Sequence, residues 1–183
     1  MNRGNPIYFH ETNQVILPVF KCAYTSTHEA YSKMGKALAS FNDLIDYDGV
    51  EKIAMVRNPF DRVVSLYTRN NQNPDGLHDK KRTFAEFVDR IEELLDTGNT
   101  DGHYNTLVAN LSIHGRFMPD VVFKLEAKEE FINYIPQPEL PFPRANATVN
   151  RQPDYRDYYE TTSLIDKVEK IYLDDLEKFG YEF

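Results

Sequence analysis

The chain of 183 residues contains no tryptophan, a single cysteine and no long hydrophobic run. The lone Cys22 excludes an internal disulfide and a metal cluster built on cysteines. No segment approaches the roughly 20 apolar residues that a membrane-spanning helix needs. The apolar run at 14–20 is too short, and starts too late, for a signal peptide. We therefore expect a cytoplasmic protein without a membrane span.

Basic residues are also scarce, since 21 Lys and Arg stand against 29 Asp and Glu, a net charge of −8. This balance argues against a nucleic-acid or general polyanion binder, whose affinity comes largely from basic surface. Any anion should instead meet a local cluster of Lys and Arg. What the chain does have is ordinary for a globular protein, with 41% hydrophobic residues, 12 Tyr and 12 Phe. The length predicts one domain over 1–183.

Short apolar runs alternate with helical patterns along the chain. The runs at 15–20, 51–57 and 120–125 read as buried strands, after an irregular lead-in at 1–12. Helical periodicity is found at 29–41, 59–69, 83–95 and 126–134. This alternation predicts an α/β fold, a three-layer sandwich with a mainly parallel central sheet.

The last third of the chain has two further features. Five prolines between 136 and 154 forbid regular structure over most of that segment, which predicts a loop that wraps the fold. The segment 161–179 is strongly amphipathic and is followed by Gly180, which predicts a closing helix.

The segment around Arg57 reads as a strand that runs directly into a helix. Asn58 is a good N-cap, and Pro59 suits the first helical position. Ser65 then lies about two turns into the helix. A guanidinium and a hydroxyl placed in this way can hold an anion. A capped helix with a solvated polar face explains the same residues, so this segment alone leaves both interpretations open.

An earlier strand-to-helix turn lies at 21–27. Lys21 offers a point charge, and the start of the helix offers backbone N–H groups and the positive end of a dipole. Hydroxyl groups follow at Thr25, Ser26 and Thr27, of which Thr25 or Ser26 is also the expected helix cap. The turn is built like a phosphate loop, although the Walker A pattern is absent. An ordinary capped turn fits these residues equally well.

Together the two turns resemble those of the nucleotide-dependent sulfotransferase family. The family's second motif has the form R-[ND]-P-x-x-R-x-x-S-x-Y, which is nearly complete from Arg57 to Tyr67. The segment 172–181 also resembles the closing helix of these enzymes. Within the family, the Golgi-type and bacterial carbohydrate sulfotransferases are the most similar. The resemblance implies a P-loop nucleotide-kinase-like fold.

It also implies a donor, 3′-phosphoadenosine 5′-phosphosulfate, and a reaction that needs no metal. By resemblance, Arg57 and Ser65 hold the 3′ phosphate, and Arg151, with Arg144 second, lies in a loop over the nucleotide. By the same resemblance, the first turn holds the 5′ phosphosulfate, and its residues are Lys21, Ala23, Tyr24, Thr25, Ser26 and Thr27. Family members usually carry a glycine in that turn, where this chain has Ala23 or Tyr24.

Two side chains are expected to carry the chemistry. Lys21 is placed to stabilise charge on the bridging oxygen of the donor, and His103 resembles the histidine of the carbohydrate enzymes that takes the acceptor proton. His28, Glu29 and Asp43 remain alternatives for this base. The acceptor would be a hydroxyl of a glycan or another small molecule, and the sequence does not define the oligomeric state.

Two other functions remain open on the sequence. A nucleotide or small-molecule kinase would also place phosphate at a strand-to-helix turn, and a non-catalytic nucleotide-binding protein could share the fold. Binding of ATP with magnesium would favour the kinase. Binding of the bisphosphate without transfer would favour the non-catalytic protein.

Overall fold

The computed structural model describes residues 5–38, 44, 49–72, 82–98, 101–135, 142–143 and 152–183, without the side chains of 71 and 72. The chain forms two compact units. The first comprises Met1–Arg57 and Leu107–Ala147, and the second comprises Asn58–Thr106 and Thr148–Phe183. None of the described helices is long and apolar enough to cross a membrane.

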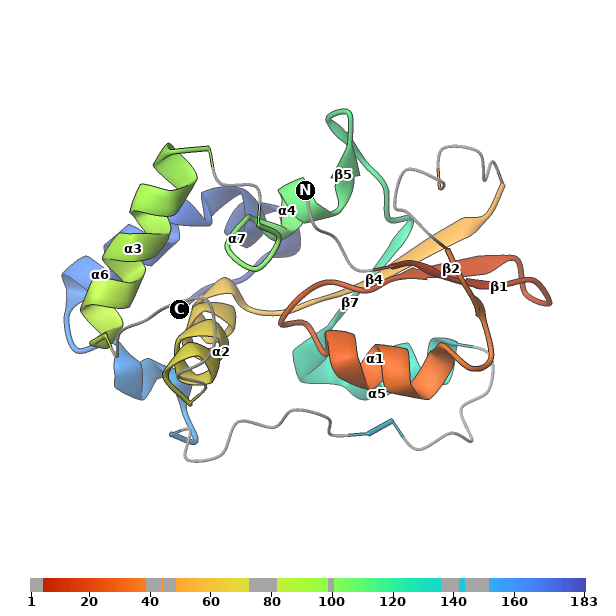
Figure 1. The fold of residues 1–183 in the computed structure, drawn as a ribbon, viewed down its shortest axis with the longest axis horizontal. Coiled ribbons are helices and arrows are strands. Elements are labelled where there is room, and N and C mark those ends of the chain that lie inside the picture. The colour runs from red at the N-terminus through yellow and green to blue at the C-terminus, as the bar shows by residue number, and fades with distance from the viewer. Residues whose placement is uncertain are drawn as a thin grey trace. The chain divides into compact units, whose positions relative to one another are not determined.

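A five-stranded sheet forms the centre of the first unit (Figure 1). Its strands follow the order β3 (Lys36–Ala37), β1 (Ile7–Phe9), β2 (Gln14–Leu17), β4 (Glu51–Val56) and β7 (Val121–Lys124). The three predicted strands are β2, β4 and β7, and they pair in parallel. β1 is antiparallel to both of its neighbours, so the prediction of an irregular lead-in was wrong there. The fold is thus mixed α/β around a sheet with a parallel core.

Two helices of the first unit, α1 (Tyr24–Tyr31) and α5 (Lys128–Tyr134), lie on the same face of this sheet (Figure 1). They share one apolar core with β1, β2 and β4. Its buried members are Ile7, Phe9, Ile16, Ala30, Tyr31, Ile53, Met55, Phe131 and Ile135. The unit also contains the short helix α4 (Leu107–Asn110), the hairpin of β5 (Ser112–Ile113) and β6 (Arg116–Phe117), and the 3-10 turn η2 (Leu125–Ala127).

The first helix is shorter than the sequence predicts. The backbone N–H groups of Met34 and Gly35 both donate to the carbonyl of Tyr31, where the chain turns back toward the sheet. A Cβ at Gly35 would lie only 2.5 Å from a methyl carbon of Ile7. Gly35 therefore allows a close backbone approach that ends the helical path and lets β3 pair with β1.

The second unit is helical. It contains α2 (Pro59–Gln72), α3 (Phe84–Asp96), the 3-10 turn η3 (Tyr155–Tyr158), α6 (Thr162–Ile171) and α7 (Leu173–Phe179). α3 and α6 lie side by side (Figure 1), joined at the surface by Lys167, whose Nζ is 2.6 Å from Asp89. The predicted start of α3 is fixed by a capping box between Thr83 and Glu86. The buried core of the unit comprises Phe60, Val63, Val64, Leu66, Phe84, Phe87, Val88, Ile91, Tyr104, Tyr159, Val168, Tyr172 and Leu176.

The closing segment forms two helices where the sequence predicts one over 161–179. α6 and α7 are separated by Tyr172, whose backbone leaves the helical region at φ −114° and ψ 24°. The Tyr172 side chain is fully buried, and its hydroxyl donates to the carbonyl of Tyr104. Burial of this ring therefore accompanies the break between the helices. Of the predicted proline-rich loop at 136–154, only 142–143 and 152–154 belong to the described residues.

Candidate active site

The turn between β2 and α1 has an unusual backbone. Lys21 and Ala23 have positive φ angles of 67° and 57°, in the left-handed region that glycine favours. Ala23 is the N-cap of α1, and no side chain caps the helix. The expectation that Thr25 or Ser26 caps it was wrong, because the helix begins at Tyr24 and places both residues in its first turn.

The left-handed conformation at Ala23 is strained. A residue with a Cβ needs about 1–2 kcal/mol to adopt it. Ala23 is one of the two positions, with Tyr24, at which the resemblance expects a glycine. Strain of this kind is found preferentially at functional sites, where the surrounding structure maintains it.

The side chains that follow the turn differ in exposure. Tyr24 and Thr25 are half-buried, whereas Ser26 and Thr27 are 5% and 2% exposed. The ring of Tyr24 packs between Phe20 and His28, with centroids 4.9 and 4.6 Å away. Burial raises the pKa of Tyr24 and lowers that of His28, and a hydrogen bond to the backbone of Asn5 opposes both shifts.

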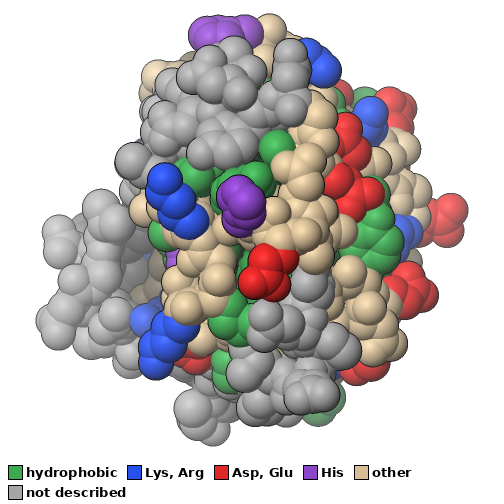
Figure 2. Space-filling view, turned by 90° about the vertical axis from the view of Figure 1, so that its right-hand side faces the viewer, with side chains coloured by type: hydrophobic (Ala, Val, Ile, Leu, Met, Phe, Trp, Pro, Cys, Tyr) green, Lys and Arg blue, Asp and Glu red, His purple; other side chains and the backbone are tan. Residues whose placement is uncertain are grey.

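Arg57 lies at the end of the neighbouring strand β4 and contacts this turn. Its Nη1 donates to the carbonyl oxygen of Lys21 over 3.1 Å. Because β2 and β4 pair in parallel, their carboxyl ends meet at the same edge of the sheet. The hydrogen bond thus joins Arg57 to the backbone of Lys21, the residue to which the resemblance assigns the other phosphate. On the face shown in Figure 2, the described Lys and Arg side chains are scattered and form no large basic patch.

α2 begins as the sequence predicts. Asn58 caps it, since its Oδ1 accepts from the backbone N–H of Phe60 at 3.0 Å, and its Nδ2 donates to the carbonyl of Glu182 at 2.9 Å. The sequence places Arg62, Ser65 and Arg69 on one side of this helix, and the interpretation of that side as a solvated polar face was wrong for two of them. Ser65 is only 8% exposed and Arg62 is fully buried, both in the second unit.

The buried Arg62 holds the turn that carries His103. Its Nη1 donates to the carbonyl of Asn105 at 2.8 Å, and its Nη2 donates to the carbonyls of Gly102 at 2.9 Å and His103 at 3.1 Å. The sequence assigns this arginine no role. Its place in the second motif is the only sequence signal that pointed to it.

His103 is paired with Asp101. Nδ1 of the imidazole is 2.8 Å from Oδ1 of Asp101, and the backbone N–H of His103 donates to the same oxygen over 2.9 Å. The His103 side chain keeps 39% of its surface exposed, so the ring remains accessible. Sequence reasoning named the segment around His103 but missed Asp101 as its partner.

A family model described as the Sulfotransferase family matches residues 16–182. The chain belongs to this family. Both strand-to-helix turns, the His103 turn and the closing helices lie within the matched residues, which confirms the resemblance read from the two motifs. No curated protein and no solved structure matches the chain. Membership supports an enzyme that transfers sulfuryl groups.

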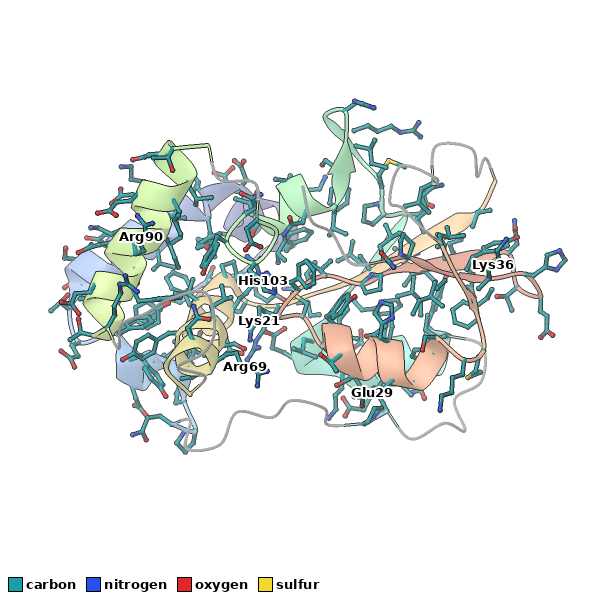
Figure 3. The ribbon with its side chains drawn as sticks, in the orientation of Figure 1. Lys21, Glu29, Lys36, Arg69, Arg90 and His103 are labelled. Atoms are coloured by element: carbon teal, nitrogen blue, oxygen red, sulfur yellow. The ribbon has the colours of Figure 1, made fainter. Side chains whose placement is uncertain are left out.

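Two alternative candidates for the base of the sulfotransferase site lie on α1. Glu29 is exposed on the side of α1 that faces away from the sheet (Figure 3), and His28 is half-buried on the same helix. Asp43, Arg144 and Arg151 lie outside the described residues. Among the residues that the structure describes, no three His, Cys, Asp or Glu side chains are grouped to hold a metal ion.

Proposed function

We propose that this sulfotransferase moves a sulfuryl group from 3′-phosphoadenosine 5′-phosphosulfate to a hydroxyl of a carbohydrate or another small acceptor. The observation that carries the proposal is the hydrogen bond from Arg57 to the Lys21 carbonyl, in a chain that belongs to the Sulfotransferase family. It joins the two motifs to which the resemblance assigns the two phosphate ends of this donor.

The first turn has the chemistry that a phosphosulfate group requires. Its left-handed residues allow backbone N–H groups to converge, as in the anion-binding concavities called nests. α1 adds the positive end of its dipole, and Lys21 adds a formal charge. We assign the 5′ end of the donor to this turn, with Ala23, Tyr24, Thr25, Ser26 and Thr27.

The second motif supplies the proposed site for the 3′ phosphate. Arg57 offers planar N–H donors that suit a phosphate, and Ser65 offers a hydroxyl. We also assign Arg151 to the nucleotide, on the resemblance alone. We also propose that residues 1–183 form one sulfotransferase domain with the P-loop-kinase-like, three-layer fold of the family. The cytoplasmic location stays a prediction.

His103 is the proposed base. The acceptor hydroxyl gives its proton to His103 as its oxygen bonds to sulfur, while the bond from sulfur to the bridging oxygen breaks and Lys21 stabilises the charge that develops there. The donor supplies the sulfuryl group when it is bound. His28 and Glu29 are weaker candidates, because one is half-buried in an aromatic stack and the other faces away from the sheet.

The test is a transfer assay with the donor and a panel of sugars, glycans and small phenols and alcohols. Formation of 3′,5′-bisphosphoadenosine together with a sulfated acceptor is the expected result, and His103→Ala should reduce its rate. Donor binding without transfer to any acceptor would favour the non-catalytic alternative. Phosphate transfer from ATP with magnesium would contradict the proposal in favour of a kinase.

A further inference from the structure

The turn at 101–105 is held more firmly than an ordinary surface turn. The amides of Tyr104 and Asn105 both donate to the carbonyl of Asp101, at 3.1 and 3.2 Å. The next four carbonyls along the chain, those of 102–105, each accept from a buried side chain of the second unit. Arg62 donates hydrogen bonds to three of them, and the Tyr172 hydroxyl donates to the carbonyl of Tyr104 at 2.8 Å.

Burial of the charged Arg62 side chain in this network costs free energy. Arg62 is 0% exposed, and burial of a guanidinium costs several kcal/mol unless hydrogen bonds and nearby charges compensate. Three carbonyl acceptors supply part of this compensation and, in return, fix the path of the turn. A turn held in this way keeps one orientation of the side chain that it presents, which a site for chemistry requires. That side chain is His103, which remains part-exposed.

The pairing with Asp101 then determines which ring nitrogen carries the proton. Oδ1 of Asp101 already accepts from the His103 backbone N–H, and a carboxylate oxygen can only accept. The 2.8 Å contact with Nδ1 must therefore use a hydrogen on that nitrogen. In the neutral imidazole this leaves the lone pair on Nε2, the ring atom remote from Asp101.

We propose that Asp101 is a positioning residue, which holds His103 as the Nδ1–H tautomer so that Nε2 receives the acceptor proton, with Arg62 and Tyr172 fixing the turn. This inference rests on the proposed sulfotransfer and names how its base is prepared. The proton moves from the acceptor hydroxyl to Nε2, and Asp101 stabilises the resulting imidazolium without taking the proton itself.

The tautomer can be measured without donor or acceptor. Long-range ¹⁵N–¹H spectra of protein labelled at histidine should show a protonated Nδ1 and an unprotonated Nε2 for His103 at a pH where the ring is neutral. Asp101→Ala removes the oxygen that accepts from Nδ1, so the Nδ1–H form loses its hydrogen bond and a protonated Nε2 should appear in the neutral ring. Asp101→Glu keeps a carboxylate and should retain the wild-type tautomer. His103→Ala assigns the signals.

Kinetics provide the second readout. Asp101→Ala should lower kcat by about 10²-fold while KM for the donor stays within about twofold, because a general base contributes on the order of 10²–10⁴ to the rate and this variant neither orients the ring nor stabilises its imidazolium. Asp101→Glu should recover part of that loss. Asp154→Ala is the matched control, since Asp154 also accepts from the backbone N–H two residues on, that of Arg156, and its loss should leave kcat unchanged.

The outcomes separate this inference from the proposed function. A wild-type His103 protonated on Nε2, or an Asp101→Ala protein with unchanged tautomer and kcat, overturns the role of Asp101 even if sulfotransfer is active. If the tautomers behave as described but the wild-type protein transfers no sulfuryl group, the proposed function is wrong. If His103→Ala turns over as fast as the wild type, His103 is not the base and the inference fails with it.

Discussion

The guanidinium of Arg57 donates a hydrogen bond to the backbone carbonyl of Lys21, with 3.1 Å between Nη1 and the oxygen. These residues follow two parallel neighbouring strands, β4 and β2, and each precedes a helix. The contact couples the position of the second motif's arginine to the left-handed backbone of the first turn. A substitution in one motif should therefore alter the geometry of the other.

Arg57→Ala should weaken the binding of 3′,5′-bisphosphoadenosine by about 10- to 150-fold. This range corresponds to the roughly 1.5–3 kcal/mol of a hydrogen bond to a charged group. Isothermal titration calorimetry measures it directly. Arg90→Ala is a suitable control, because it removes the same charge from the surface of α3 (Figure 3), where Arg90 pairs with Glu93. Equal affinity of the Arg57 variant and the wild type for the bisphosphate would show that Arg57 does not bind the nucleotide.

Lys21→Ala should affect turnover more than binding, because charge on the bridging oxygen grows as the bond to sulfur breaks. We expect kcat to fall by about 10²–10³-fold, the usual effect of removing one group that stabilises a transition state. The change in KM for the donor should be smaller. Steady-state kinetics of Lys21→Ala and of Lys36→Ala, an exposed lysine of the same unit, provide the comparison. Similar losses in the two variants would contradict the role of Lys21.

Substitutions at Ala23 should change the stability of the protein in a way that tests the strained left-handed conformation of the turn. Ala23→Gly removes a strain of about 1–2 kcal/mol and adds about 0.5–1 kcal/mol of chain entropy, so stability should stay equal or rise slightly. Ala23→Val places a β-branched side chain at positive φ and should cost about 2 kcal/mol or more. Ala30→Gly, inside the same helix, should destabilise by about 1 kcal/mol. Urea unfolding measures all three, and a clear loss on Ala23→Gly would contradict the strained turn.

The stability of the second unit should fall at alkaline pH. Burial raises the pKa of Tyr159 and of Tyr172 above the ordinary value of 10.0. Their contribution is complete below about pH 10 and is lost as the pH rises further, because unfolded phenols release protons that the folded ones retain. Each tyrosine should contribute about 1.4 kcal/mol per pH unit in that range.

The corresponding variants are Tyr159→Phe and Tyr172→Phe. Each loses a hydrogen bond, to the carbonyl of Phe60 or of Tyr104, and so starts from a lower stability. The informative quantity is the slope of the free energy of unfolding between about pH 10 and 12, which should be shallower than in the wild type. Parallel curves would show that these phenols titrate equally in the folded and unfolded chains.

Hydrophobic periodicity accounts for most of the fold. β2, β4 and β7 were predictable because each is a compact apolar run, and α2 and α3 carry both an apolar face and a cap at Asn58 or Thr83. β1 and β3 were missed, since strands of three and two residues give no periodic signal. The early end of α1 depends on contact of Gly35 with Ile7, which local sequence does not encode.

The candidate site was predictable to the extent that its residues follow secondary-structure boundaries. Lys21 and Arg57 could be placed at neighbouring strand ends because each follows an apolar run and precedes a helical pattern, whereas their phosphate-binding roles stay predictions. Arg62 was missed because its position on α2 reads as polar surface, although the folded chain buries it completely. The role of Asp101 depends on the fold of its turn, which sequence spacing alone does not specify.

The central claim is that the two motifs bind a nucleotide with a phosphate at each end. Calorimetric titration of the wild-type protein with 3′,5′-bisphosphoadenosine, beside ATP with magnesium under the same conditions, tests it most directly. The account predicts tight binding of the bisphosphate and at least about tenfold weaker binding of ATP, a difference of about 1.4 kcal/mol. Tight binding of ATP with magnesium and none of the bisphosphate would contradict it.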